Sequence, residues 1–260
     1  MPYLNNLYYF ARQARERGGE TLVLLHGAGG THLFWPPQVR RLSHLQILAP
    51  DLPGHGRSGG DGLQSIVAYA AWVADWLNAI GIKRAYLGGH SMGSAIALQL
   101  ALISPDLVAG LILIGAGARL KVHPDILNKL VKEETFKEAV EIVVSAAFAD
   151  QTPARLKELA FQRMAATRQA ILYGDFIACN DFDLIQNLAQ VRQPAMVICG
   201  DQDRLTPRRY AEYLVCQLPD AHLHIVENAG HMVMLERPVL IAQLIREFIS
   251  RLTIRSKRME

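Results

Sequence analysis

Residues 85–93 read Ala-Tyr-Leu-Gly-Gly-His-Ser-Met-Gly, an apolar run that passes into a glycine-rich turn with a serine near its centre. Residues 85–87 predict a buried strand, and the apolar spacing of residues 94–102 predicts a helix directly after the turn. G-x-S-x-G between a strand and a helix is the pattern of a nucleophile elbow, in which a strained turn exposes a serine hydroxyl above a sheet edge. A Cβ atom at either glycine of the pattern would collide with neighbouring backbone. The stretch therefore predicts that Ser91 is a nucleophile.

Short apolar runs rich in Leu, Val and Ile recur on both sides of this stretch. They lie at residues 22–25, 45–48, 111–114, 196–199 and 223–226. Segments with helical spacing of apolar residues alternate with them, at residues 65–80, 94–103, 208–218 and 239–252. This alternation favours an α/β fold with a doubly wound, mostly parallel sheet. Ligands of such sheets bind outside the carboxyl ends of the strands, where Ser91 is expected to lie.

The region from residue 119 to residue 190 interrupts the alternation. It contains no convincing strand, and its helix-period stretches, for example 130–149 and 154–170, carry more charge. A crossover between parallel strands needs only about a dozen residues, so the extra length indicates an insertion. We expect a helical lid at residues 119–190 and a core formed by residues 1–118 and 191–260.

Composition and charge exclude several classes of protein. The chain has 260 residues, of which 50% are hydrophobic and 20% are charged, as in an ordinary globular protein. A formal net charge of +3 is too weak to indicate a nucleic-acid partner. Cys179, Cys199 and Cys216 are far apart, which suggests neither a disulfide framework nor a zinc site.

The sequence also indicates where the protein resides. The residues after Met1 form no apolar leader segment, and the longest apolar run, at 107–118, is shorter than the ~18–20 residues that cross a bilayer. We therefore expect a cytoplasmic protein without membrane contact, and the sequence indicates no oligomeric state.

Four further motifs accompany the elbow. They are Leu25-His26-Gly27-Ala28-Gly29-Gly30, Asp51-Leu52-Pro53-Gly54-His55-Gly56-Arg57-Ser58, Gly200-Asp201-Gln202-Asp203 and Ala229-Gly230-His231. With these motifs the chain resembles the α/β-hydrolase superfamily over nearly its whole length, and in particular the serine hydrolases and esterases with a helical lid. The motifs are specific for the superfamily and do not specify a substrate.

This resemblance implies a catalytic triad. A serine hydroxyl is a poor nucleophile at neutral pH and needs a base, which in turn needs a group that orients it. The order Ser91, Asp203, His231 is the order of nucleophile, acid and base in this superfamily, and each residue follows a predicted strand. Asp201 is the rival acid. The superfamily's G-x-x-D pattern favours Asp203, and Asp201 is expected to serve the turn.

An oxyanion hole is implied in the same way. Acyl transfer places negative charge on a carbonyl oxygen, which must meet preorganised hydrogen-bond donors. The backbone N–H of Met92, at the start of the helix after the nucleophile, is expected to be one donor. By resemblance the second is the N–H of Ala28.

The other histidines have structural interpretations. By resemblance, His26 and His55 are expected to bond backbone, and His90 is expected to point away from the site. His222 and His224 share a strand face but lack a third ligand, so no metal is expected. The remaining positions, His32, His44 and His123, are expected at the surface or in loops.

We expect large apolar side chains near the oxyanion loop and from the lid to wall the substrate pocket, although such residues at helical spacing are more often core. They are Phe34, Trp35, Phe136, Phe148, Phe161, Met164 and Phe182. Such a pocket would suit a modest apolar acyl group or an aromatic ester.

The expected activity is cleavage of a carboxylic ester through an acyl-enzyme, without a cofactor. Relatives with the same triad cleave lactones, thioesters and C–C bonds of vinylogous diketones, so these reactions remain alternatives. Two further alternatives are an acyltransferase, in which an alcohol replaces water, and a non-catalytic binding protein that keeps the fold.

Overall fold

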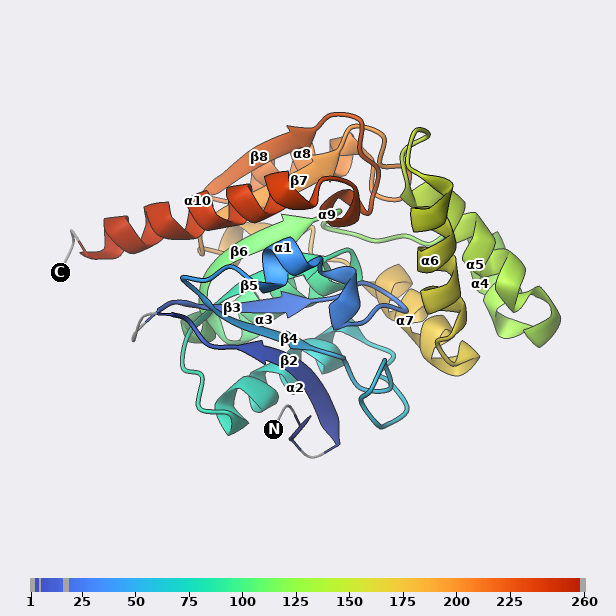
Figure 1. The fold of residues 1–260 in the computed structure, drawn as a ribbon, viewed down its shortest axis with the longest axis horizontal. Helices are drawn as coiled ribbons and strands as arrows, with labels where there is room; N and C mark the ends of the chain where they lie inside the picture. Colours follow the sequence, from blue (N-terminus) through green and yellow to red (C-terminus); the bar gives the residue numbers. More distant parts are fainter. Residues whose placement is uncertain (1–2, 5, 16–18, 258–260) are drawn as a thin grey trace.

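The computed structural model describes residues 3–4, 6–15 and 19–257. A β-sheet lies at its centre (Figure 1). The expected absence of an apolar leader segment concerns in part Met1, Pro2 and Asn5, which lie outside the described residues. Within the described part, the sheet has eight strands in the order β1-β2-β4-β3-β5-β6-β7-β8. The strands are β1 (Tyr3–Leu4), β2 (Leu7–Arg12), β3 (Thr21–Leu25), β4 (Gln46–Pro50), β5 (Ala85–His90), β6 (Val108–Ile114), β7 (Ala195–Gly200) and β8 (Ala221–Val226).

The sheet is parallel from β4 to β8, as the apolar runs predict. Every residue of β3, β5 and β7 is buried, since these strands have neighbours on both sides and helices on both faces. The antiparallel strands β1 and β2 were not expected from the sequence. Four residue pairs join β2 to β4, and they place the N-terminal segment at one side of the sheet.

Helices cover both faces of the sheet. One core cluster packs α2 (Ile66–Ala79), α3 (Met92–Ile103) and α8 (Arg208–Gln217) against the sheet. The other cluster contains residues of α1 (Pro37–Arg40), α9 (Val233–Glu236) and α10 (Pro238–Lys257). The predicted helices at 65–80, 94–103, 208–218 and 239–252 correspond to α2, α3, α8 and α10. Three short 3₁₀ turns also occur, namely η1 (His32–Phe34), η2 (Pro105–Leu107) and η3 (Leu188–Gln190).

Four consecutive helices follow β6 before the chain re-enters the sheet at β7. They are α4 (Pro124–Val131), α5 (Glu133–Ala147), α6 (Ala154–Ala165) and α7 (Gln169–Asp181). In Figure 1 they lie together on the right, beyond the arrowheads of β3 and β6. The helix-period stretch at 130–149 contains the last two residues of α4 and all of α5, and Lys132, with extended backbone angles, separates these two helices.

No helix in the described part of the chain combines the length and the apolar character needed to span a bilayer.

Candidate active site

Ser91 occupies a strained turn between β5 and α3. Its backbone has φ +52° and ψ −116°, a conformation that costs of order 1–3 kcal/mol for a residue with a side chain. The turn is held by neighbours, since the Ser91 N–H donates to Ile114 O at 2.9 Å and its carbonyl accepts from Ser94 Oγ at 2.6 Å. A Cβ at Gly89 would lie 2.3 Å from Gly93 O, and one at Gly93 would lie 2.2 Å from Leu25 O. Both glycines of the motif are therefore required by close backbone approach.

A buried histidine–carboxylate pair lies at the same end of the sheet. His231 Nδ1 is 2.9 Å from Asp203 Oδ2. Thr206 Oγ1 donates to that same oxygen at 2.7 Å, and Asp203 Oδ1 accepts the backbone N–H groups of Leu205 and Thr206 at 2.9 and 2.8 Å. Both carboxylate oxygens are thus fixed, and a carboxylate at Nδ1 favours the tautomer whose Nε2 is free to accept a proton.

The electrostatics of the pair keep Asp203 ionised. Burial by itself would raise the pKa of this carboxyl group. The charge of His231 and the hydrogen bonds from His231 and Thr206 outweigh burial, so the pKa lies below its usual value. Asp203 is therefore a fixed negative charge at neutral pH.

The loop after β3 is shaped by its own hydrogen bonds. Gly30 N–H donates to Gly27 O at 3.0 Å, and His26 Nδ1 is 2.8 Å from the same carbonyl. His26 Nε2 accepts the N–H of Leu52 at 3.0 Å, which fixes a neutral imidazole with its proton on Nδ1. Burial, followed by the neighbouring His55, lowers the pKa of His26 to about 4.

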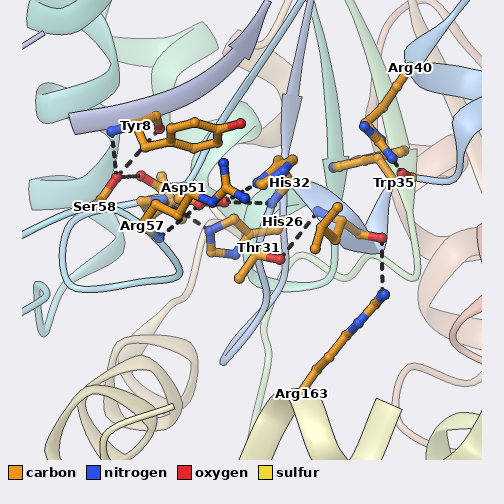
Figure 2. A network of polar contacts seen from close by, with 12 residues as sticks. Tyr8, His26, Thr31, His32, Trp35, Arg40, Asp51, Arg57, Ser58 and Arg163 are labelled. Carbon is orange, nitrogen blue, oxygen red and sulfur yellow. Dashed lines mark hydrogen bonds and ion pairs between the residues drawn. The ribbon is translucent and has the colours of Figure 1, made fainter. Parts of the chain in front are cut away.

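A second polar network supports the far end of this loop (Figure 2). The fully buried Asp51 accepts the backbone N–H of His32 at 2.7 Å and lies 2.8 Å from His32 Nδ1. It also accepts the N–H of Arg57 at 3.0 Å, and its carbonyl accepts from Ser58 Oγ at 2.6 Å. Arg163 of α6 reaches the same region and donates to Leu33 O at 3.3 Å.

Ser91 and His231 line one cavity of about 230 Å³ between the sheet and helices α4–α7. Ala28 and Met92 differ in their position relative to this cavity. Ala28 is part of the lining, whereas the Met92 side chain is fully buried and Met92 is the first residue of α3. The first N–H groups of a helix have no partner within the helix, and the Met92 N–H belongs to this first turn of α3. The lining of the cavity thus includes a serine hydroxyl and an imidazole that is held by a buried carboxylate, and α3 begins directly after the serine.

The sequence matches the family model described as "Alpha/beta hydrolase family" over residues 22–244. The chain belongs to the alpha/beta hydrolase family. It is 29% identical to an uncharacterised hydrolase of Bacillus subtilis, with 94% of each chain covered. It is also 29% identical to a pimeloyl-(acyl-carrier protein) methyl ester esterase of Serratia marcescens, over 90% of this chain and 95% of that one. A solved thermophilic esterase shares 30% identity, with a TM-score of 0.82 and 96% of both chains covered. The protein is thus a hydrolase of this family.

The cavity of this alpha/beta hydrolase has walls that differ in part from those expected. Phe34 and Met164 are among its lining residues. The other aromatic residues named from the sequence are not. Trp35, Phe136 and Phe148 are buried in the core cluster around α1 and α10, Phe161 packs against that cluster, and Phe182 is buried in the cluster around α2 and α3. The side chains that line the cavity beside Phe34 and Met164 include Leu120, Val122, Ile126, Val143, Phe176, Leu205 and Met232.

Two histidines of the hydrolase lie elsewhere than expected. His90 does not point away from the site, because it lines the cavity, its ring centroid is 4.7 Å from that of His231, and its Nε2 lies 3.1 Å from His231 O. Burial, followed by the charge of His231, lowers its pKa to about 3, so this imidazole is neutral. His32 is buried rather than exposed, since Asp51 provides it with a partner. His222 and His224 belong to no cluster of three or more potential metal ligands among the residues that the structure describes.

The sequence analysis did not identify Thr206, or the cavity-lining residues Leu120 to His123 and Ile126. A threonine three residues after the acid is in reach of the carboxylate, because Asp side chains commonly bond backbone two or three residues on. Residues 120–126 follow β6 closely, and the carboxyl ends of parallel strands are where ligands bind. Both signals were present in the sequence.

Proposed function

We propose that this hydrolase cleaves carboxylic esters through a triad of Ser91, His231 and Asp203, with the N–H groups of Ala28 and Met92 as the oxyanion hole. The observation that carries the proposal is the buried 2.9 Å contact between His231 Nδ1 and Asp203 Oδ2 beside a cavity that Ser91 also lines. An ester is supported further by the esterases among the relatives and solved neighbours.

The reaction proceeds in two steps. Ser91 Oγ attacks the ester carbonyl carbon while His231 Nε2 takes the hydroxyl proton, and the carbonyl oxygen becomes an oxyanion between the two backbone donors. The tetrahedral species collapses, the C–O bond to the leaving group breaks, and His231 returns the proton to the departing alcohol. Water then attacks the acyl-enzyme while His231 takes one of its protons. The bond between the acyl carbon and Ser91 Oγ breaks, His231 returns the proton to Ser91 Oγ, and the carboxylic acid is released. Asp203 holds the imidazole in orientation and balances its transient positive charge.

The walls of the cavity favour a short apolar substrate. A volume of about 230 Å³ is smaller than the ~300–1,000 Å³ of pockets that hold drug-sized ligands. Carboxylate side chains are not among its lining residues, and the polar side chains at its rim include Lys121, His123 and Arg204. A short-chain acyl or aryl ester is therefore the preferred substrate class.

Residues 119–190 act as the lid of this site, and residues 1–118 with 191–260 form the core. Val143 on α5, Met164 on α6 and Phe176 on α7 line the cavity, so each of these helices contributes to the wall opposite the sheet. Exchange of these side chains should change acyl-chain preference without changing the chemistry.

The test compares wild-type protein with Ser91→Ala on 4-nitrophenyl butyrate. We expect Ser91→Ala to lower kcat/KM by at least ~10³-fold with an unchanged circular dichroism spectrum. Turnover of Ser91→Ala near the wild-type rate would refute the proposal, because catalysis would then not depend on Ser91. Absence of turnover in the wild-type protein would favour the non-catalytic alternative.

A substrate panel then separates the hydrolytic alternatives. The panel contains aryl esters of increasing chain length, an aryl carbamate, a lactone, an acyl thioester and a vinylogous diketone. The highest kcat/KM on a short ester supports the proposal, and the highest value on any other class reassigns the reaction. Addition of an alcohol tests the acyltransferase alternative, because preferential formation of a product ester over the free acid would establish transfer.

A further inference from the structure

Asp175 is a fully buried carboxylate on α7, a helix that belongs to the lid segment. Its Oδ1 accepts a hydrogen bond from Tyr69 OH at 2.8 Å. Its Oδ2 accepts the backbone N–H of Gly29 at 2.8 Å and lies 2.7 Å from His55 Nε2. The three partners come from α2, from the loop after β3 and from the loop after β4, so one side chain joins the lid to three parts of the core.

His55 compensates the negative charge. Its Nδ1 lies 3.0 Å from Pro53 O and its Nε2 faces Asp175, so both ring nitrogens face acceptors. Burial alone would lower the pKa of His55, but the charge and hydrogen bond of Asp175 outweigh burial and raise it. A buried carboxylate with a compensating partner and all its contacts satisfied has a defined position.

Gly29 is the point where the lid meets the loop that carries Ala28. Its N–H is bound by Asp175, and its carbonyl accepts from Thr167 Oγ1 at 3.1 Å. Gly29 has φ +60°, and a Cβ there would lie 2.6 Å from Leu172 and 3.2 Å from Met164, both in the lid. Both backbone groups of this residue are therefore held by side chains of the lid, directly after the peptide that carries the proposed oxyanion donor.

We infer that Asp175 is a positioning residue that sets the direction of the Ala28 N–H by holding the next residue of the loop, with Thr167 as its second support. This inference rests on the proposed function. Asp175 and Gly29 are not among the residues that line the cavity, so the effect passes through the backbone and not through substrate contact. Loss of the support should weaken binding of the oxyanion and leave binding of the uncharged ground state unchanged.

The experiment compares Asp175→Ala, Asp175→Asn and Thr167→Val with two controls. Asp181→Ala removes an exposed carboxylate from the same helix. Tyr69→Phe removes a hydrogen bond to the same Asp175 carboxylate and leaves the Gly29 contact in place. For each variant we would measure Tm, kcat/KM on 4-nitrophenyl butyrate and the Ki of two ketones. An aryl trifluoromethyl ketone forms an oxyanion adduct with Ser91, and the matching methyl ketone reports binding without that adduct.

We expect Asp175→Ala to lower kcat/KM by about 10–100-fold and to raise the Ki of the trifluoromethyl ketone by a similar factor, with the Ki of the methyl ketone within about twofold of wild type. Asp175→Asn keeps one oxygen that can accept from Gly29 and should recover part of the activity. Thr167→Val should show the same pattern with a smaller loss, and Tyr69→Phe should lower Tm while kcat/KM stays within about twofold.

Other outcomes would overturn the inference. It is wrong if Asp175→Ala and Thr167→Val keep wild-type kcat/KM, if Tyr69→Phe lowers kcat/KM as much as Asp175→Ala, or if both ketones weaken equally. Should Asp175→Ala fail to fold, the half-buried Thr167 decides, because valine has nearly the same shape. Ser91→Ala distinguishes the two proposals, since an inactive Ser91→Ala beside a fully active Asp175→Ala rejects the inference alone.

Discussion

Asp201 Oδ1 accepts the backbone N–H of Ala229 at 3.2 Å, while the carboxylate two residues later contacts the imidazole of His231. The two acids of the Gly200–Asp203 motif thus have different partners. Asp201 joins the turn after β7 to the loop that carries the histidine, and Asp203 contacts the histidine itself.

This division predicts different kinetic effects for two matched substitutions. Asp203→Asn should lower kcat by about 10³–10⁴-fold, because an amide stabilises the imidazolium poorly and favours the wrong tautomer. Asp201→Asn keeps an oxygen that can accept from Ala229, so kcat should change by less than about threefold. Steady-state kinetics on one aryl ester checks both, and the reverse ranking would make Asp201 the acid.

Gly27 is a position where an added side chain should impair activity. A Cβ there would lie 2.9 Å from His90 Nδ1 and 3.1 Å from Ser91 Cβ. Gly27→Ala should therefore displace the serine or the oxyanion loop and lower kcat/KM by about 100-fold, since misplacement by about 1 Å can cost that much. Gly59→Ala is the matched control, because the nearest atom to its Cβ is 3.4 Å away in Asn6. Equal activity of the two variants would contradict this prediction.

Two buried histidines should make the free energy of unfolding depend on pH. The pKa of His26 is lowered to about 4 and that of His90 to about 3, in both cases chiefly by burial. The unfolded chain binds these protons near pH 6.5 and the folded protein does not. The free energy of unfolding should therefore decrease as pH falls from about 6.5 to 4, by about 1.4 kcal/mol per pH unit for each histidine.

Urea denaturation at intervals between pH 7 and pH 4.5 measures that slope. His90→Gln should reduce it, whereas replacement of the exposed His123 by Gln should not. A slope that is the same in His90→Gln as in wild type would show that His90 does not contribute.

Activity should not depend on a bound metal ion. The proposed chemistry uses a serine, a histidine and backbone donors, none of which needs a metal. Dialysis against EDTA, with metal content measured before and after, should leave kcat/KM unchanged. A loss that zinc restores would return attention to His222 and His224.

The sequence was informative where local chemistry decides the structure. The elbow at Ser91 could be predicted because its glycines are required where backbone segments approach closely. The buried parallel strands could be predicted because their apolar runs are uninterrupted. Strand β2 was missed because its residues, Leu7–Arg12, mix buried and exposed positions without strict alternation, and a long-range pairing with β4 decides its conformation.

Long-range contacts also explain what was missed in the site. The partners of Asp175 lie 106 to 146 residues away in the chain, so no local pattern indicates them. Phe148 is as apolar as Phe176, but only the three-dimensional packing makes one a core residue and the other a wall of the cavity.

The carboxylate of Glu236 joins the histidine loop to the segment between α5 and α6. Its Oε2 accepts the N–H of Gly230 at 2.7 Å, and its Oε1 accepts the N–H of Ala149 at 3.0 Å and the hydroxyl of Thr152. A chimaera that replaces residues 119–190 with the lid of another hydrolase, in order to broaden the substrate range, would remove the contacts that Ala149 and Thr152 make with Glu236. A recombination boundary should therefore keep residues 149–152 together with the parental Glu236, or introduce a donor segment and its acceptor as a pair.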